Sequence, residues 1–350
     1  MIKVLIVDDS AFMRKLLSDL FAAEPDFEVI DTARNGREAV DKTKRLKPHL
    51  ITMDVEMPIM DGIKALELIM KEEPTPVVMV SSLTRAGADA TLRALELGAV
   101  DFVAKAAGPI AGIAGISAEI LEKCRGAVKA NVAQLAKRQP SATTFVKPPP
   151  VQVASSYLGS DEQIIAIGTS TGGPRALQEV ITRLPGNLPC GVVIVQHMPP
   201  GFTKSLSERL NSLSSLTVKE AEHNDVIRPG LVLIAPGDYH MTVEREANRK
   251  VVRLSQQPPI GGHRPAVDPM MESVANLYGS RAVGVILTGM GHDGAKGIQA
   301  IKGRNGYTIA EDQSTAVVFG MPKSAIELGV VDKVAPLSAI AGEIVRSVNK

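Results

Sequence analysis

The sequence predicts an α/β protein of two domains, each built on a mostly parallel β-sheet. Its 350 residues suffice for two hydrophobic cores, because one domain usually takes roughly 100 to 200 residues. In both halves, short apolar runs alternate with helix-length segments, which is typical of parallel sheets with crossover helices. Residues 139–160 are rich in Pro, Ser and Thr and carry no acid, so we expect a flexible linker there. The domains are then expected over 1–138 and 161–350.

The first domain contains five candidate strands, each followed by a candidate helix. The apolar runs that predict the strands cover 3–8, 27–33, 49–54, 76–82 and 100–105. The helices are expected to begin at Ser10 and to continue the series over 36–46, 62–70, 86–97 and about 116–137. This order predicts a doubly wound, five-stranded parallel sheet.

The second domain repeats the alternation, with apolar runs that are mostly separated by helix-length segments. These runs predict strands over 163–170, 191–197, 231–236, 282–289 and 306–312. We therefore expect a second α/β domain with a mostly parallel sheet.

Composition excludes several classes of protein. The net charge is +1, aromatic residues make up 3% and Trp is absent, whereas nucleic-acid binding usually needs a basic surplus and stacking aromatics. The most apolar stretch, 106–116, is short and interrupted by Gly and Pro, so we expect no membrane insertion. The N-terminus becomes acidic at Asp8, unlike a signal peptide, which predicts a cytoplasmic location. Cys124 and Cys190 have no metal-binding or redox spacing and are expected to be plain thiols.

Acidic side chains follow two strands of the first predicted sheet. Asp8 and Asp9 follow the first strand and Asp54 ends the third, and the carboxyl ends of parallel strands meet at one edge. Three carboxylates this close repel one another unless a cation lies among them, and oxygen ligands favour Mg²⁺. Lys105 could balance the charge and Ser81 offers a hydroxyl. Asp8 and Asp9 alone could equally be acids at the start of a helix.

The five positions together resemble the receiver domain of response regulators over residues 2 to about 120. The matching segments are LIVDDS, ITMDVEMPIMDG, VMVSS and GAVDFVAK. The resemblance implies that Asp54 is phosphorylated by a phosphohistidine kinase, with Mg²⁺ held by Asp8, Asp9 and Asp54.

The same resemblance implies roles for three further residues. Ser81 would bond the phosphoryl group, Lys105 would pair with it, and Phe102 matches the aromatic switch position. Ala106 stands where the family usually has Pro, so a cis bond between Lys105 and Ala106 becomes an open question.

A possible nucleophile lies in the segment IIAIGTSTGGPRAL, where a strand runs through a Gly-rich turn into a helix. Ser170 falls in the turn and Thr171 near the helix N-terminus, where backbone N–H groups favour developing negative charge. The G-x-S-x-G pattern is also that of α/β-hydrolases, although their chain order is Ser, acid, His. A phosphate-binding loop is the alternative, but GTSTGG lacks both common nucleotide-loop spacings.

The partners of Ser170 are less well determined by the residues alone. His197 ends the strand 191–197, and Asp293 follows the strand 282–289. His263, in the segment GGHRPAVDP, and His292, beside Asp293, are rival bases. His49, His223 and His240 have no motif and are expected to be structural.

The segment from about 162 to the C-terminus resembles the catalytic domain of the chemotaxis protein-glutamate methylesterases, the CheB family, and the whole chain matches receiver, linker and esterase in order. Matching segments include IGTSTGGPRAL, IVQHMPPGFTKSLSERLN, HRPAVDPMMESVA and GVILTGMGHDGAKG. The resemblance implies a Ser170 nucleophile, a His197 base and an orienting Asp293. It also implies that Met290 N–H holds the oxyanion, and we expect Thr171 N–H as a second donor from its place at the helix start.

The implied activity removes methyl groups from glutamate γ-methyl esters of methyl-accepting chemotaxis receptors and deamidates receptor glutamines. The esterase chemistry is expected to need no cofactor, and the chain to act as a monomer. A DNA-binding output, a nucleotide-binding Rossmann enzyme and a non-catalytic adaptor are the competing hypotheses. The second domain is too large and too neutral for the first of these, and the Gly spacing argues against the second.

Overall fold

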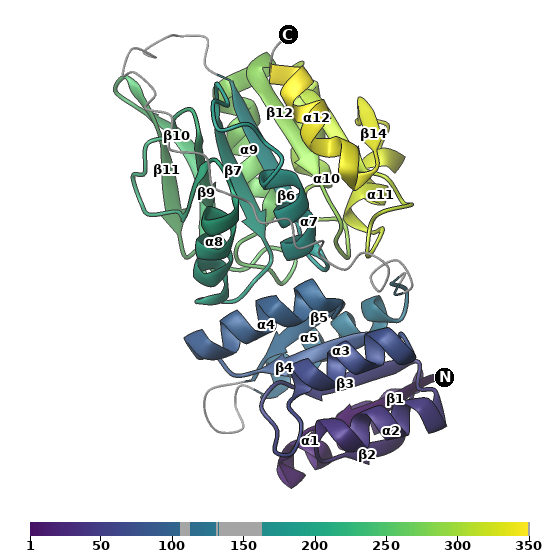
Figure 1. Ribbon diagram of the computed structural model, residues 1–350. Coiled ribbons are helices and arrows are strands. Elements are labelled where there is room, and N and C mark those ends of the chain that lie inside the picture. The colour runs from purple at the N-terminus through teal and green to yellow at the C-terminus, as the bar shows by residue number, and fades with distance from the viewer. Residues whose placement is uncertain (106–112, 131, 133–162, 349–350) are drawn as a thin grey trace. The chain divides into compact units, whose positions relative to one another are not determined.

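A computed structural model divides the chain into two compact units, residues 1–142 and 143–350 (Figure 1). It describes residues 1–105, 113–130, 132 and 163–348. The predicted linker over 139–160 lies outside the described residues, so the domain boundaries stay a prediction. In the part of the chain that the structure describes, no helix is both long and apolar enough to cross a membrane.

The N-terminal unit is the predicted five-stranded parallel sheet, with strand order β2-β1-β3-β4-β5. Its strands are β1 (Ile2–Val7), β2 (Phe27–Ala33), β3 (Leu50–Asp54), β4 (Val77–Ser81) and β5 (Asp101–Ala104). β1 lies between β2 and β3, so the chain reverses its direction across the sheet at β1. Such a switch point opens a crevice at the carboxyl ends of the strands.

Each of the first four helices begins at a residue whose side chain caps it. The helices of this unit are α1 (Ala11–Ala22), α2 (Gly36–Leu46), α3 (Gly62–Glu72), α4 (Arg85–Leu97) and α5 (Ile113–Ala127). The capping oxygens accept a backbone N–H of the first turn, and they belong to Ser10, Asn35, Asp61 and Thr84. α2 packs on α3 and α3 on α4, while α5 contacts β4 and β5.

The last helix of this unit differs from the prediction, which placed it over about 116–137. α5 begins earlier and ends at Ala127, after which Lys129 N–H and Ala130 N–H bond carbonyls three residues back, at 3.0 Å each. Residues 133–137 of the predicted helix lie outside the described residues.

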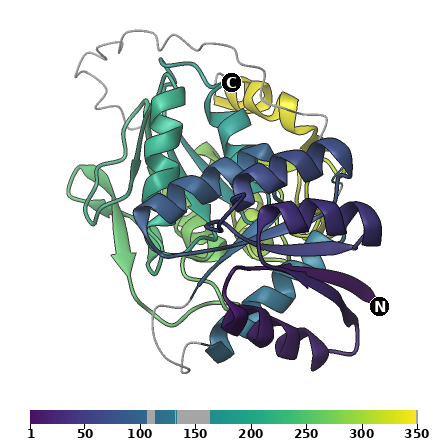
Figure 2. The same cartoon turned by 60° about the horizontal axis from the view of Figure 1, so that its bottom comes forward.

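The C-terminal unit contains a seven-stranded sheet in which every neighbouring pair is parallel, with order β14-β13-β12-β6-β7-β9-β8. Its strands are β6 (Ile164–Thr169), β7 (Gly191–Gln196), β8 (Thr217–Glu220), β9 (Leu231–Ile234), β12 (Ala282–Ile286), β13 (Tyr307–Glu311) and β14 (Lys333–Ala335). An antiparallel hairpin, β10 (His240–Glu246) with β11 (Arg249–Ser255), stands apart from this sheet (Figure 2). The prediction of a mostly parallel α/β domain is confirmed, although β8, β14 and the hairpin were not expected.

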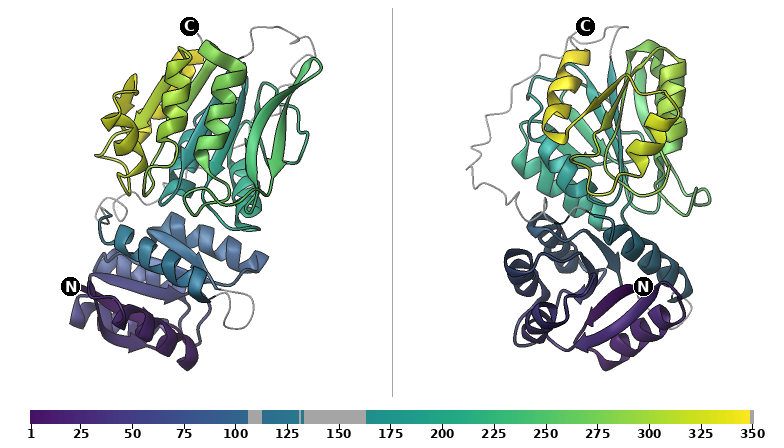
Figure 3. Two further views of the ribbon diagram at one scale, coloured as in Figure 1. Left: turned by 180° about the vertical axis from the view of Figure 1, so that it is seen from behind. Right: turned by 90° about the vertical axis from the view of Figure 1, so that its right-hand side faces the viewer.

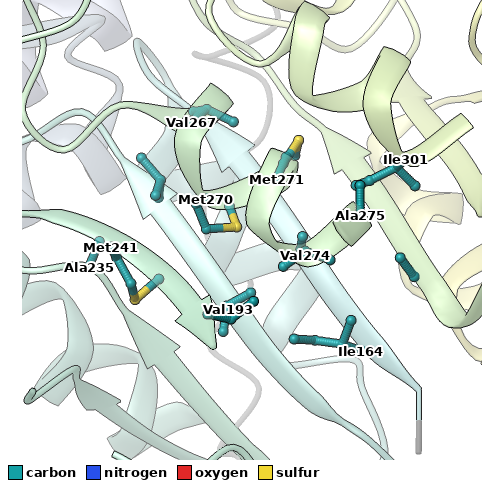
Figure 4. Close-up of a cluster of buried hydrophobic side chains, with 14 of the residues drawn as sticks. Ile164, Val193, Ala235, Met241, Val267, Met270, Met271, Val274, Ala275 and Ile301 are labelled. Carbon is teal, nitrogen blue, oxygen red and sulfur yellow. The ribbon is translucent and has the colours of Figure 1, made fainter. Parts of the chain in front are cut away.

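Helices cover both faces of this sheet (Figure 3). α7 (Gly173–Ile181) packs between α8 (Phe202–Leu213) and α12 (Leu337–Val348), whereas α10 (Ala295–Gly303) packs between α9 (Val267–Tyr278) and α11 (Met321–Glu327). Figure 4 shows the core beneath α9, where Met270 and Val274 lie against Val193 of β7 and Ile164 of β6, all fully buried. This packing holds α9 close to the central strands, and the N-terminus of α9 becomes part of the site described next.

Candidate functional site

The three predicted catalytic residues follow neighbouring strands at the centre of the second sheet. β6 lies between β7 and β12, and the chain changes its direction across the sheet there. Thr169 pairs with Gln196 in the β6–β7 register, so Ser170 and His197 are the next residues along two adjacent strands. Asp293 comes from the connection after β12. The sheet therefore gathers at one switch point three residues that are 27 and 96 positions apart in the chain.

The side chains of these residues form a continuous hydrogen-bonded chain. His197 Nδ1 lies 3.2 Å from Ser170 Oγ, and His197 Nε2 lies 2.7 Å from Asp293 Oδ2. The side chain of His197 is 5% exposed, so the ring is almost entirely shielded from water. With Nε2–H donating to the carboxylate, Nδ1 presents its lone pair to the Ser170 hydroxyl. The nitrogens therefore have the opposite roles to those in trypsin-like proteases.

The Asp293 carboxylate is held by the start of α9. Its Oδ2 accepts the N–H of Val267 at 2.7 Å and its Oδ1 that of Asp268 at 3.0 Å. Burial alone would raise the pKa of Asp293, but the hydrogen bond and charge of His197 and these two N–H groups hold the pKa below its ordinary value. The carboxylate stays ionised and fixes the tautomer of the imidazole.

The nucleophile's backbone is tied to the connection after β12. Ser170 N–H donates to Thr288 O at 3.0 Å, and Thr288 Oγ1 donates to Thr171 O at 2.9 Å. Gly289 passes so close that a Cβ there would lie 2.9 Å from Ser170 Cβ. Met290 is the next residue, so the structure brings the predicted oxyanion segment beside the nucleophile. The donor roles of Met290 and Thr171 stay predictions.

The rival histidines have different surroundings. His263 stacks on His197, with ring centroids 3.9 Å apart and planes inclined by 11°. His292 is exposed, although it is the neighbour of Asp293 in sequence. Of the three candidate bases, His197 is the one whose bond to Ser170 the structure records.

The remaining histidines make ordinary structural hydrogen bonds, as the sequence analysis expects. Lys3 N–H donates to His49 Nδ1, Leu254 N–H to His223 Nδ1 and Ala266 N–H to His240 Nδ1.

The N-terminal unit brings together the predicted acidic residues. Carboxylate oxygens of Asp8, Asp9 and Asp54 lie within 4.8 Å of one another. Lys105 Nζ is 2.6 Å from Asp54 Oδ2 and 3.2 Å from Asp8 Oδ2. Three carboxylates and one ammonium leave a surplus of negative charge on a site where Asp8 is fully buried. This donor set fits Mg²⁺, which prefers oxygen ligands and one or two carboxylates beside water and phosphate.

Burial and the neighbouring charges both shift the pKa values of Asp54 and Lys105. Burial raises the pKa of Asp54 and the neighbouring charge of Asp8 raises it further, while Lys105 opposes both. Burial would lower the pKa of Lys105, but its hydrogen bond to Asp54 and the charges of Asp54 and Asp8 raise it. The ammonium therefore stays protonated and compensates one carboxylate.

The hydroxyl of Ser81 is not bonded to Asp54. It is fully buried and donates to Gly87 O of α4 at 3.1 Å. Since Asp54 pairs with Val80 in the β3–β4 register, Ser81 lies one residue further along β4 than the partner of Asp54. Phe102, at the expected switch position, is 2% exposed and lies under Lys123 Nζ, 5.0 Å from the ring centroid. The Lys105–Ala106 bond lies outside the described residues.

Gln196 was missed by the sequence analysis. It is 2% exposed, and its Nε2 donates to Ser170 O and to His197 O. The one available signal was a polar residue at the end of an otherwise apolar strand, immediately before a candidate base.

Comparison with known proteins gives the family. The family model "CheB methylesterase" matches residues 165–344, and "Response regulator receiver domain" matches 4–115. A relative from Geobacillus kaustophilus is 49% identical over 100% of this chain and 99% of its own length. The chain belongs to the CheB methylesterase family. The predicted family is confirmed, and with it the class of enzyme.

Relatives from distant organisms share one name. Proteins from Pyrococcus horikoshii (46% identical, 99% of this chain and 94% of the relative) and Pseudomonas aeruginosa (49%, 99% and 96%) bear the name protein-glutamate methylesterase/protein-glutamine glutaminase, as does the Geobacillus relative. The crystal structure of the Thermotoga maritima CheB methylesterase catalytic domain is 49% identical, with a TM-score of 0.52 over 53% of this chain and 98% of that chain. The family's fold thus matches the C-terminal unit.

Proposed function

We propose that this chain is a protein-glutamate methylesterase and protein-glutamine glutaminase whose nucleophile is Ser170, with His197 as general base and Asp293 as the acid that orients it. The observation that carries the proposal is the His197 ring, which bridges Ser170 Oγ and Asp293 Oδ2 at 3.2 and 2.7 Å. No simple nucleotide-binding turn would need that bridge.

The reaction starts when His197 Nδ1 takes the Ser170 proton and Oγ attacks the γ-carbonyl carbon of a methylated glutamate. The resulting tetrahedral oxyanion is held by backbone donors, for which Met290 N–H and Thr171 N–H are our candidates. His197 returns the proton to the departing oxygen, and methanol leaves. A water molecule, deprotonated by the same base, then attacks the acyl carbon; the bond to Ser170 Oγ breaks, Oγ regains the proton from His197, and glutamate is released.

Deamidation of a glutamine needs no additional residue. The primary amide has the same carbonyl electrophile, and the proton from His197 converts the poor leaving group into ammonia. Both reactions end at the same glutamate, so one site serves both. The chemistry described uses no cofactor.

The N-terminal unit is proposed to control this activity through phosphorylation of Asp54 by a phosphohistidine kinase. Asp8, Asp9 and Asp54 would hold Mg²⁺, which offsets negative charge as the phosphoryl group arrives. Lys105 would pair with the phosphoryl oxygens. Ser81 would have to exchange Gly87 O for a phosphoryl oxygen, and we propose that this exchange at the start of α4 is the first movement of the switch.

The proposed substrates are methyl-accepting chemotaxis receptors. We propose that this chain acts on them as a monomer in the cytoplasm. We expect the unphosphorylated N-terminal unit to restrain the esterase. A fragment covering 155–350 should then release methanol faster than the unphosphorylated full chain, and equal rates would contradict the restraint.

The central test is methanol release from methylated receptor membranes, with and without Mg²⁺ and a small-molecule phosphodonor. We expect stimulated release from the wild type, no release from Ser170→Ala, and unstimulated release from Asp54→Ala. Release from Ser170→Ala at the wild-type rate would exclude Ser170 as nucleophile. No release from any variant, with receptor methylation verified, would favour an adaptor, and tight NAD or ATP binding in calorimetry would favour a nucleotide enzyme.

A further inference from the structure

Gln196 joins the backbones of the nucleophile and the base with a single side chain. Its amide Nε2 donates to Ser170 O at 3.0 Å and to His197 O at 3.1 Å. Both acceptors belong to residues at the end of adjacent strands, beyond the last β6–β7 register pair, Thr169 and Gln196. The last backbone bond of this ladder runs from His197 N–H to Thr169 O at 3.2 Å. Beyond it, the Gln196 amide links the carbonyls of the two chains.

The Gln196 side chain has little room to adopt another position. A Cβ on Gly173 would lie 1.9 Å from Gln196 Oε1 and 2.6 Å from Thr169 Oγ1. The side chain extends from β7, and the first residue of α7 therefore lies directly against its amide oxygen. A glycine at 173 is what permits this approach.

The amide oxygen carries a cost that packing alone does not explain. Gln196 Oε1 is buried, and no group among the described residues hydrogen-bonds it. A buried acceptor without a partner destabilises a fold, and an apolar side chain of similar size would avoid that loss. The buried Oε1 thus lowers the free energy of unfolding, while the two hydrogen bonds of Nε2 are kept.

We propose that Gln196 is a positioning residue for the hydrolase, which holds Ser170 and His197 at the spacing needed for proton transfer. The proposal rests on the proposed function. Gln196 is 2% exposed, so it acts through Ser170 and His197 and does not touch the substrate. Loss of its donors should let the 3.2 Å contact between Nδ1 and Oγ lengthen while leaving the substrate surface unchanged.

The test replaces Gln196 by Met, which has a similar shape and no donor, in the full-length chain. Thr308→Val is the matched control, because Thr308 is a fully buried residue of β13 whose hydroxyl bonds Val330 O and Asp332, away from Ser170. Two rates are measured for each variant: methanol release from methylated receptor membranes, resolved into kcat and KM, and covalent labelling of Ser170 by a fluorophosphonate. Thermal unfolding is recorded alongside.

For Gln196→Met we expect kcat and the labelling rate to fall together by about 10- to 100-fold, with KM within twofold of wild type. Thr308→Val should keep both rates within about twofold. Equal losses in the two variants, a kcat within twofold of wild type for Gln196→Met, or a change confined to KM would each overturn the proposal. If Gln196→Met does not fold, Gln196→Leu, which is also apolar and has no donor, takes its place and the same outcomes decide.

The proposed function is tested separately in the same assay. The wild type should be labelled and release methanol, and the Ser170→Ala variant should do neither. Should it not, Ser170 is not the nucleophile, whatever Gln196→Met does.

Discussion

The imidazole rings of His197 and His263 lie face to face, with centroids 3.9 Å apart and planes inclined by 11°. Ser170 and Asp293 bind the edges of the His197 ring, so His263 supplies support on a face that neither of them reaches. His263 comes from the segment before α9, and its backbone exchanges two hydrogen bonds with Ile260. The base is thus fixed both in its plane and against tilting.

Removal of this face contact should weaken catalysis modestly. An aromatic pair contributes about 0.5 to 1.5 kcal/mol, so a loss of that size in the transition state on His263→Ala should lower kcat for methanol release by about two- to thirteenfold. His263→Phe keeps a ring of similar thickness and should stay within about twofold of wild type. If His263→Phe loses as much as His263→Ala, an imidazole nitrogen matters and the stacking contact does not.

Asp293→Asn should lower kcat far more than His263→Ala does. An amide in place of the carboxylate can present its NH₂ group to His197 Nε2, which favours the wrong tautomer, and kcat should fall by about 10⁴-fold. The start of α9 also loses a negative charge, at a cost of about 0.3 to 1 kcal/mol in the free energy of unfolding.

Asp268→Asn is the control for that change, because this neighbouring carboxylate accepts Gly297 N–H and makes no recorded bond to His197. It should keep at least half of the wild-type kcat.

Because the pKa of Asp293 lies below its ordinary value, the stability it provides is present above about pH 4 and is lost only as the pH falls through its folded pKa. Thermal unfolding of wild type and Asp293→Asn should therefore differ at pH 7 and converge in strong acid.

Gly289→Ala should disable the site through steric contact. The new Cβ would lie 2.2 Å from Met321 Sδ and 2.9 Å from Ser170 Cβ, so either the nucleophile or α11 must shift. We expect a loss of about 1 to 3 kcal/mol in the free energy of unfolding and at least a tenfold drop in kcat. Gly303→Ala, at the end of α10 with open space around it, should instead gain about 0.4 to 1 kcal/mol. Equal stability in both variants would contradict the close approach at Gly289.

The acidic pocket predicts a metal-dependent stability. Because the pKa of Asp54 is raised in the folded state, its contribution is favourable below its ordinary pKa near 4 and is lost as the pH rises through the folded value. At pH 7, without Mg²⁺, Asp54→Asn should therefore raise the unfolding midpoint of the full chain's first transition. Added Mg²⁺ should raise the midpoint of the wild type more than that of Asp54→Asn. A larger Mg²⁺ effect in Asp54→Asn would argue against Asp54 as a ligand.

Sequence patterns were sufficient for much of the architecture. Apolar runs predict the strands, and the helix start expected at Ser10 is confirmed by its cap, because these signals are local. The short β14 and the β10–β11 hairpin were missed, since β14 has three residues and the buried residues of β10 and β11 do not alternate regularly with exposed ones. The end of α5 was placed too late among the described residues: the continuation looks helical in sequence, but the hydrogen bonds of Lys129 and Ala130 reach back three residues instead of four.

By itself the sequence determined which residue types stand at the strand ends: a hydroxyl at Ser170, an imidazole at His197, and carboxylates at Asp54 and Asp293. Only the tertiary structure decided how they meet. Nδ1 faces Ser170, His263 covers the ring, Gln196 spans two carbonyls and Ser81 points to Gly87. These relationships depend on strand register and on packing between segments far apart in the chain, and local residue patterns do not encode distances of a few ångströms across such separations.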